Sequence, residues 1–189
     1  MDGDVAIVIG ASGGIGQALI AALRLDQRYQ HVVGLSRQRP PDLIDDARQT
    51  WLEANILDAS NLQLAARRVA ALGMPTRVIV ATGALHSAGM SPEKSLRALN
   101  ADALAEGFAI NAIGPALVAQ HFLPAMPRDR ASVFAALSAR VGSIADNAAG
   151  GWYGYRASKA ALNMIIRTAA IEHSRSNPLG VCVAVHPGT

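Results

Sequence analysis

The chain has 189 residues, of which 51% are apolar and 16% are charged, and its formal net charge is +3 at pH 7. This length suits one domain with a sizeable core, and the scattered arginines form no basic stripe with interleaved aromatic residues, which argues against nucleic-acid binding. The single cysteine, Cys182, excludes an internal disulfide and lies in an apolar run typical of a buried strand. Because no signal peptide opens the chain and no apolar stretch approaches the ~20 residues that span a bilayer, we expect a cytoplasmic protein without membrane contact.

Short apolar runs alternate with helical patterns along the whole chain. The runs that we predict as strands lie at 5–9, 31–35, 51–57, 77–81, 131–137 and 180–185. The patterns that we predict as helices lie at 14–25, 61–72, 101–126 and 153–174. Such alternation predicts βαβ units, and uniformly apolar strands are typical of a parallel sheet covered on both faces. We therefore predict a single-domain α/β fold, a Rossmann-type doubly wound parallel sheet of six strands with helices on both faces.

Glycines follow the first predicted strand at the point where a helix begins. Gly10, Gly14 and Gly16 have the spacing G-x-x-x-G-x-G, with Ser12 and Ile15 among the residues between them. Glycine allows the positive φ of a tight turn, and its missing side chain lets the backbone approach a pyrophosphate. The free N–H groups of a helix N-terminus favour the charge of such a group. The loop therefore predicts dinucleotide binding, the alternative being a glycine-rich turn that binds nothing.

The end of the second predicted strand indicates which dinucleotide binds. NAD sites usually place a carboxylate there, on the ribose 2′-hydroxyl, but this strand ends in Ser36 and Arg37. A guanidinium pairs with a 2′-phosphate in bidentate fashion, and the Ser36 hydroxyl offers a further donor. We therefore predict NADP(H), the alternative being that Arg37 is a solvated surface residue.

Tyr155 and Lys159 lie four residues apart, and therefore on one face of the last predicted helix. An ammonium beside a phenol favours the phenolate and lowers the tyrosine pKa from about 10. Tyr155 would then exchange a proton with a substrate oxygen near neutral pH. The alternative is an ordinary pair on the surface of a helix.

Asn111 lies four residues before Pro115 in the long middle helix. Because proline has no N–H, the carbonyl of Asn111 loses its helical partner. A water is the simplest replacement, so the sequence predicts a local opening of the helix at Asn111. The alternative is a kink that only aids packing.

With these motifs the chain resembles the short-chain dehydrogenase/reductase family over nearly its whole length, in the branch with G-x-x-x-G-x-G and Y-x-x-x-K. The resemblance implies that Tyr155 is the general acid, that Lys159 lowers its pKa and binds the nicotinamide ribose, and that the Asn111 carbonyl holds a relay water. It also implies three further cofactor-contacting segments, which are Asn55-Ile56, Thr82-Gly83-Ala84 and Pro187-Gly188.

The active-site serine of the family has no simple counterpart in this chain. The family's register after the fifth strand places the position at Ala139. Ser138 lies one residue earlier, and strand side chains alternate between faces. Ser143 follows the next turn. We predict that Ser138 polarises the substrate carbonyl and keep Ser143 as the alternative.

The activity implied by the resemblance is hydride transfer between NADPH and a small carbonyl or alcohol substrate. No metal is needed, and the five histidines show no ligand spacing. The segment 151–163 looks most like carbonyl-reductase and C-factor relatives. Two alternatives are a C-factor-like signalling or regulatory protein that binds cofactor with little turnover, and a nucleotide-sugar epimerase, whose glycine spacing usually differs and whose chains are much longer.

Two expectations concern the assembly and the extent of the chain. The predicted helices at 101–126 and 153–174 are apolar over more than one stripe, so we expect a homodimer or homotetramer that forms through them. Relatives carry a seventh strand at the sheet edge, whereas this chain stops at Thr189 after six. We therefore expect residues 1–189 to be a C-terminally incomplete NADP(H)-binding domain and the natural polypeptide to continue.

Overall fold

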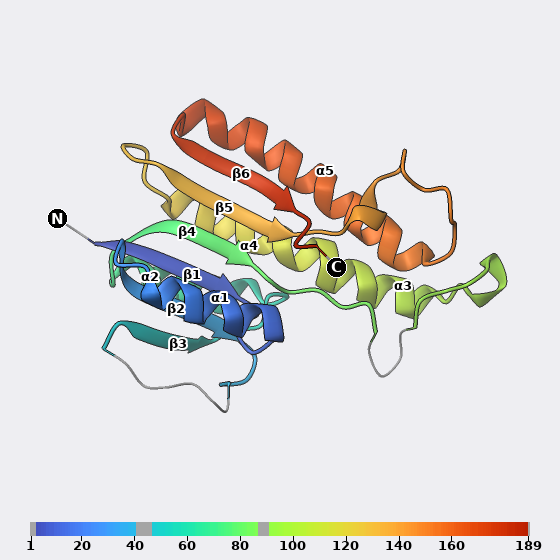
Figure 1. Ribbon diagram of the computed structural model, residues 1–189, viewed down its shortest axis with the longest axis horizontal. Helices are drawn as coiled ribbons and strands as arrows, with labels where there is room; N and C mark the ends of the chain where they lie inside the picture. Colours follow the sequence, from blue (N-terminus) through green and yellow to red (C-terminus); the bar gives the residue numbers. More distant parts are fainter. Residues whose placement is uncertain (1–2, 41–46, 87–90, 189) are drawn as a thin grey trace.

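The computed structural model, which describes residues 3–40, 47–86 and 91–188, contains one parallel sheet of six strands in the order β3-β2-β1-β4-β5-β6 (Figure 1). The strands are β1 (Asp4–Ile9), β2 (Tyr29–Ser36), β3 (Gln49–Glu53), β4 (Met74–Val80), β5 (Ser132–Leu137) and β6 (Gly180–Val185). The helices are α1 (Gly14–Leu25), α2 (Ala59–Ala70), α3 (Ala101–Phe108), α4 (Gly114–Phe122) and α5 (Tyr153–Ser176). The predicted fold class is confirmed. Thr189, on which the expectation of a longer polypeptide rests, lies outside the described residues.

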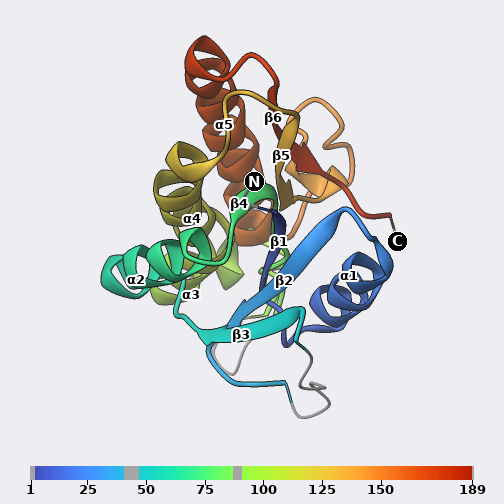
Figure 2. The same cartoon turned by 90° about the vertical axis from the view of Figure 1, so that its left-hand side faces the viewer.

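The helices form two layers of unequal size around the sheet. Helix α1 packs on β1 and β2 from one face, whereas α2, α4 and α5 lie together on the other (Figure 2). Strand β1 is buried almost throughout, but β5 alternates buried and partly exposed residues. The uniform burial that the apolar pattern predicted therefore holds along β1 and not along β4, β5 or β6.

The larger core lies between the sheet and the helices α2, α4 and α5. Its fully buried members include Leu62, Phe122, Phe134 and Ile166. Cys182 of β6 belongs to this core, with its Sγ 3.8 Å from the carbonyl oxygen of Ile166. Burial raises the pKa of its thiol to about 11. The prediction that Cys182 is a buried strand residue is confirmed.

The third strand ends earlier than predicted, at Glu53 rather than at residue 57. The cause is local: the side-chain oxygen of Asn55 accepts a hydrogen bond from Leu57 N at 3.0 Å, which turns the chain. Asp58 then accepts from the backbone N–H groups of Ser60 and Asn61 and begins α2 two residues before the predicted start. Asn55 and its neighbour Ile56 consequently follow β3 in a loop.

The predicted helix at 101–126 is interrupted in its middle. Residues Ala109–Ile113 form a π-helical turn between α3 and α4, and Leu123–Ala125 form a short 3₁₀ turn. The π-helical turn contains Asn111, where the sequence predicted an opening. By length and composition the whole stretch Ala101–Ala125 would suffice to cross a membrane, which the sequence expectation did not foresee. In this fold its parts pack on α2, α5 and β4, and 39% of its most apolar window is buried.

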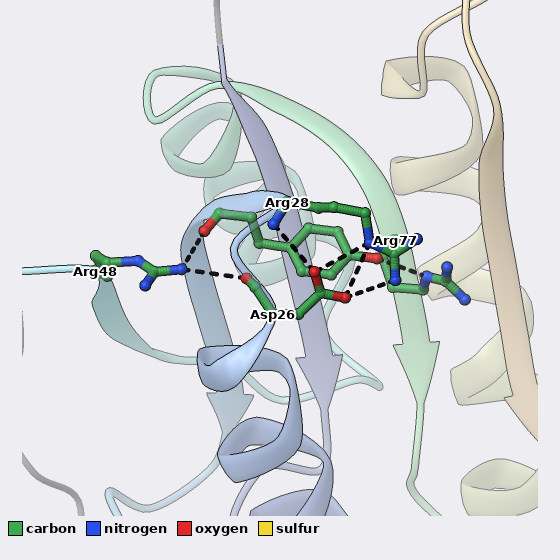
Figure 3. Close-up of polar contacts among 5 residues, drawn as sticks. Asp26, Arg28, Arg48 and Arg77 are labelled. Atoms are coloured by element: carbon green, nitrogen blue, oxygen red, sulfur yellow. Dashed lines mark hydrogen bonds and ion pairs between the residues drawn. The ribbon is translucent and has the colours of Figure 1, made fainter.

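Hydrogen bonds and an ion pair connect polar side chains near the amino ends of β2 and β3 with one on β4 (Figure 3). The guanidinium of Arg28 binds both carboxylate oxygens of Asp26 and holds its pKa down at about 2. Arg48 donates to the carbonyl oxygens of Asp26 and Tyr29, and Arg77 Nε donates to the Tyr29 hydroxyl at 3.1 Å. These contacts tie together the starts of β2 and β3 and the strand β4. The opposite end of the sheet, at the carboxyl ends of the strands, holds the loops described next.

Candidate active site

A cavity of about 290 Å³ lies across the carboxyl ends of β1, β2 and β4. It brings together residues that the sequence analysis assigned to the cofactor from four separate segments of the chain. Those lining it are Gly10, Ser12, Ser36, Arg37, Asn55, Ile56, Thr82, Gly83 and Ala84. Ligands of open parallel sheets bind at this edge, where the strand order reverses between β1 and β4.

The glycine-rich loop has the geometry of an anion cradle. Gly10 has φ +88°, which a side chain would strain, and a Cβ at Gly16 would collide with the Gly10 carbonyl. A Cβ at Gly14 would meet open space. Helix α1 begins here without a side-chain cap, so its first N–H groups face the loop unmasked. Ile15 is half exposed on the first turn of α1.

Two polar side chains of this cavity behave differently from each other. Thr82 Oγ1 is buried and has no hydrogen-bond partner, which suits a bound polar group. The Ser36 hydroxyl, in contrast, donates to Gln38 O at 2.6 Å and accepts from Trp51 Nε1 at 2.9 Å. Its predicted role as a donor to a 2′-phosphate stays a prediction, and that role would require the Ser36 hydroxyl to leave Gln38 O. Arg37 is exposed at the edge of the cavity.

Asn111 is buried and binds two other segments through its side chain. Its amide oxygen accepts from Ala84 N at 2.8 Å, and its amide nitrogen donates to Ala84 O at 2.9 Å and to Ser158 Oγ at 3.2 Å. It thereby joins the π-helical turn to the loop after β4 and to α5. The sequence analysis used only the main-chain carbonyl of Asn111 and missed this side-chain role. No sequence signal identified the partners, which lie 27 and 47 residues away.

Lys159 lies between the loop after β4 and Tyr155. A Cβ at Gly83 would lie 3.3 Å from Lys159 Nζ and 3.5 Å from Asn111 Oδ1, so the three residues adjoin one another. Lys159 Nζ donates to Leu137 O at 2.8 Å and lies 5.8 Å from the ring centroid of Tyr155. The predicted pair is therefore on one side of α5 and faces the end of the sheet.

The electrostatics of this pair differ from the sequence expectation. Burial raises the pKa of Tyr155, and burial also lowers the pKa of Lys159 to about 8. The expected lowering of the tyrosine pKa by the ammonium is not found, because removal of both groups from water dominates at this separation. The sequence shows the spacing of the two residues but not their burial.

A second cavity of about 510 Å³ adjoins Tyr155 and shares no lining residue with the first. Its lining mixes apolar, polar and charged residues, namely Leu85, Ser138, Ala139, Arg140, Val141, Asp146, Trp152, Tyr155, Arg156, His186, Pro187 and Gly188. Such a mixture suits a small organic molecule. Pro187 and Gly188, which were assigned to the cofactor, line this second cavity and are absent from the lining of the first.

The structure separates the two candidate serines. Ser138 lines the second cavity together with Tyr155, but its hydroxyl donates to Asn163 Oδ1 at 2.6 Å. Ser143 is not part of that lining, and its hydroxyl accepts from Asp146 N at 3.3 Å. Ala139 also lines the cavity. Within residues 3–40, 47–86 and 91–188, no group of three or more His, Cys, Asp or Glu residues could hold a metal ion.

A six-stranded parallel sheet with a glycine-rich loop after β1 and a cavity across the strand ends defines a Rossmann-type dinucleotide-binding domain. The model of the family described as short chain dehydrogenase matches residues 4–189, and the chain belongs to this family.

Individual relatives agree with this assignment. The chain is 42% identical to C-signal of Myxococcus xanthus over 86 residues, which are 45% of this chain and about half the length of that protein. A carbonyl reductase from Pseudomonas aeruginosa superposes with a TM-score of 0.78 at 26% identity, over 98% of this chain and 83% of that one. A short-chain dehydrogenase/reductase from Burkholderia multivorans, solved with bound NADP, superposes with a TM-score of 0.81 at 26% identity. The match covers 100% of this chain and 80% of that one.

Proposed function

We propose that this protein is an NADPH-dependent oxidoreductase that transfers hydride between the nicotinamide and a small carbonyl or alcohol substrate. The observation that carries the proposal is the position of the Tyr155–Lys159 pair between the two cavities. Lys159 Nζ adjoins Gly83, which lines the first cavity, and Tyr155 lines the second. A proton donor thus stands between a site shaped for a dinucleotide and a site shaped for a small molecule.

The described residues fit a dinucleotide. Gly14 leaves open space for a pyrophosphate, the amino end of α1 favours its charge, and the buried Thr82 Oγ1 has an unused hydrogen-bonding group. When bound, NADPH supplies the hydride. Tyr155 then gives its proton to the substrate oxygen, and its raised pKa keeps that proton in place until charge develops on the oxygen. Lys159 would bind the nicotinamide ribose through Nζ, which in this structure donates to Leu137 O.

The preference for NADP(H) over NAD(H) rests on Arg37. It lies at the edge of the first cavity, directly after β2, where its guanidinium can pair with a 2′-phosphate. As long as the Ser36 hydroxyl donates to Gln38 O, Arg37 is the one of these two residues that can bind the 2′-phosphate. The Burkholderia multivorans relative, solved with NADP, supports the same preference.

Substitution of Tyr155 by phenylalanine tests the mechanism. The change keeps the ring and removes the proton, so we expect NADPH to bind as before while turnover of aldehydes, ketones and quinones falls by ~100-fold or more. Tyr153→Phe is the matched control, because Tyr153 lies on the same helical turn and has no lysine four residues later. NADPH oxidation and calorimetric binding measure the two quantities. Wild-type turnover in Tyr155→Phe would remove Tyr155 from the mechanism.

The second function that the sequence analysis kept as an alternative, that of a signalling or regulatory protein that binds NADPH with little turnover, rests on one specific observation. Alanine occupies position 139 in the cavity, and the neighbouring hydroxyl of Ser138 is engaged by Asn163. No serine hydroxyl is therefore ready to polarise a carbonyl in this arrangement of the described residues. Tight NADPH binding by the wild-type protein without oxidation by any member of the substrate panel would support this second function.

We also propose that two copies pair through α4 and α5. Met164 and Ile171 of α5 are 66% and 46% exposed, and a cavity of about 400 Å³ between the two helices is lined by a mixture of apolar and polar residues. An apolar surface of this kind is typical of a homo-oligomer interface. Sedimentation equilibrium would measure the mass of the assembly.

A further inference from the structure

Glu93 is a buried carboxylate far from α5 in sequence and in contact with its amino end. Only 8% of the residue is exposed, and its carboxylate oxygens accept hydrogen bonds from Gly154 N at 3.1 and 3.3 Å. Its main-chain oxygen accepts a second bond, from Trp152 N at 2.6 Å. The two amides flank Tyr153, and Gly154 directly precedes Tyr155 in the chain. Glu93 therefore binds the backbone on which the proposed proton donor is mounted.

Helix α5 lacks a cap of its own. Its N-cap residue, Trp152, makes no side-chain hydrogen bond to the helix, and its first turn contains no acidic residue. The first N–H groups of a helix need acceptors, and they carry a partial positive charge that favours a carboxylate. Glu93, 61 residues earlier, supplies both the acceptor and the charge.

Gly154 provides the room for this carboxylate. A Cβ at position 154 would lie 2.8 Å from Glu93 Oε1 and 2.9 Å from Leu104 Cδ2. Contacts this short require one of the groups to move. The space that Glu93 occupies thus exists because residue 154 has no side chain, and the two positions depend on each other.

Trp152, whose main chain also binds Glu93, has an unusual backbone conformation. It has φ +54° and ψ +42°, and it is the one non-glycine residue with positive φ in the part of the chain that the structure describes. A side-chain-bearing residue keeps this conformation when its surroundings impose it, and such residues cluster at functional sites. The main-chain hydrogen bond from Trp152 N to Glu93 O holds this residue in place, and it involves the same residue whose buried carboxylate binds Gly154 N. The Trp152 ring meets the Tyr155 ring edge-on, with centroids 6.3 Å apart, and lines the second cavity.

We propose that Glu93 is a positioning residue for Tyr155, which acts by fixing the first turn of α5 and the wall that Trp152 forms beside it. The inference rests on the proposed reductase function. Glu93 does not line the first cavity, so its effect should fall on the chemical step and not on cofactor binding. Because a backbone amide needs only an acceptor, glutamine should replace Glu93 in large part, whereas alanine should not.

The variants Glu93→Ala and Glu93→Gln test the proposal, with Asp102→Ala as control because Asp102 is an exposed carboxylate on α3, outside the cavity between α4 and α5. We expect kcat to fall by roughly tenfold or more in Glu93→Ala, since a displacement near 1 Å costs up to about 100-fold. The Kd of NADPH should not change. Glu93→Gln should recover most of the lost kcat. Equal losses in both variants, or a parallel loss of NADPH binding, would indicate general disruption and overturn the proposal.

Hydrogen–deuterium exchange over residues 152–158 provides a measurement that does not depend on turnover. Glu93→Ala should speed exchange in this segment, and Glu93→Gln and Asp102→Ala should not. Gly154→Ala, which would push the carboxylate away, should act like Glu93→Ala and serves in its place if that variant does not fold. A wild-type protein inactive on every carbonyl would refute the proposed function, while the exchange comparison would still decide the role of Glu93. Unchanged exchange over residues 152–158 in Glu93→Ala would overturn the proposed positioning role of Glu93.

Discussion

Replacement of Lys159 by methionine should stabilise the fold at neutral pH while it removes turnover. Burial lowers the pKa of Lys159 from 10.5 to about 8, which corresponds to about 3 kcal/mol of unfolding free energy lost as long as the amine is charged in both states. Methionine has a similar volume and no charge. It gives up the hydrogen bond from Nζ to Leu137 O, worth about 1–2 kcal/mol. The net expectation is a gain of about 1–2 kcal/mol.

The pH dependence gives this prediction its sign. The folded-state pKa lies below the unfolded-state value, so the unfolded chain binds more protons between about 8 and 10.5. The cost of burying the ammonium is therefore complete below pH 8 and disappears as the pH rises through this window. The wild-type protein should gain stability relative to Lys159→Met over the same window.

Urea unfolding of the two proteins between about pH 7 and about pH 10 measures the difference. The difference between the two proteins is used because the Cys182 thiol, whose pKa burial raises to about 11, also titrates in alkaline solution. Its contribution to the unfolding free energy is the same in both proteins and cancels in the difference. The reasoning would be refuted if Lys159→Met were the less stable protein at pH 7, or if the difference in unfolding free energy did not change with pH.

Two further predictions concern the cofactor and the serine. Arg37→Glu should shift the ratio of NADPH to NADH affinity by roughly tenfold or more towards NADH, because a repulsive carboxylate replaces the partner of the 2′-phosphate; titrations with both cofactors check this, and equal weakening of both would contradict it. If Ser138 leaves Asn163 to polarise the carbonyl, Ser138→Ala should lower kcat by ~100-fold and Ser143→Ala should have little effect. The opposite result in steady-state kinetics would assign the role to Ser143, and two silent substitutions would favour the regulatory function.

The fold was predictable because its signals are local. Strand runs ending in glycine, the spacing from Gly10 to Gly16, and the proline that follows Asn111 each describe a few neighbouring residues, and each led to the right element. The end of β3 was not predicted, because the turn at Asn55 outweighs the apolar pattern beyond it. Sequence patterns weigh apolar periodicity over a window, and a single side-chain-to-backbone hydrogen bond can end a strand inside it.

The site was less predictable, because its remaining features are contacts between distant segments. The side-chain hydrogen bonds of Asn111 to Ala84 and of Glu93 to Gly154 each join residues separated by more than 25 positions. Neither pair forms a sequence motif with a fixed spacing. The pKa of Tyr155 depends on how far the ring is removed from water, which the Y-x-x-x-K spacing does not report. The roles assigned to Tyr155, Lys159 and Ser138 in turnover stay predictions.

The position of Cys182 makes one motion of the sheet directly measurable. The thiol lies on β6, at the end of the strand order, and points into the core against α5. Burial and a pKa near 11 make it unreactive in the closed state. A thiol reagent would consequently label the protein only when β6 separates from α5, at a rate that reports the frequency of that separation. Because residues 1–189 contain no other cysteine, this chain carries a single-site chemical reporter of the separation of β6 from α5.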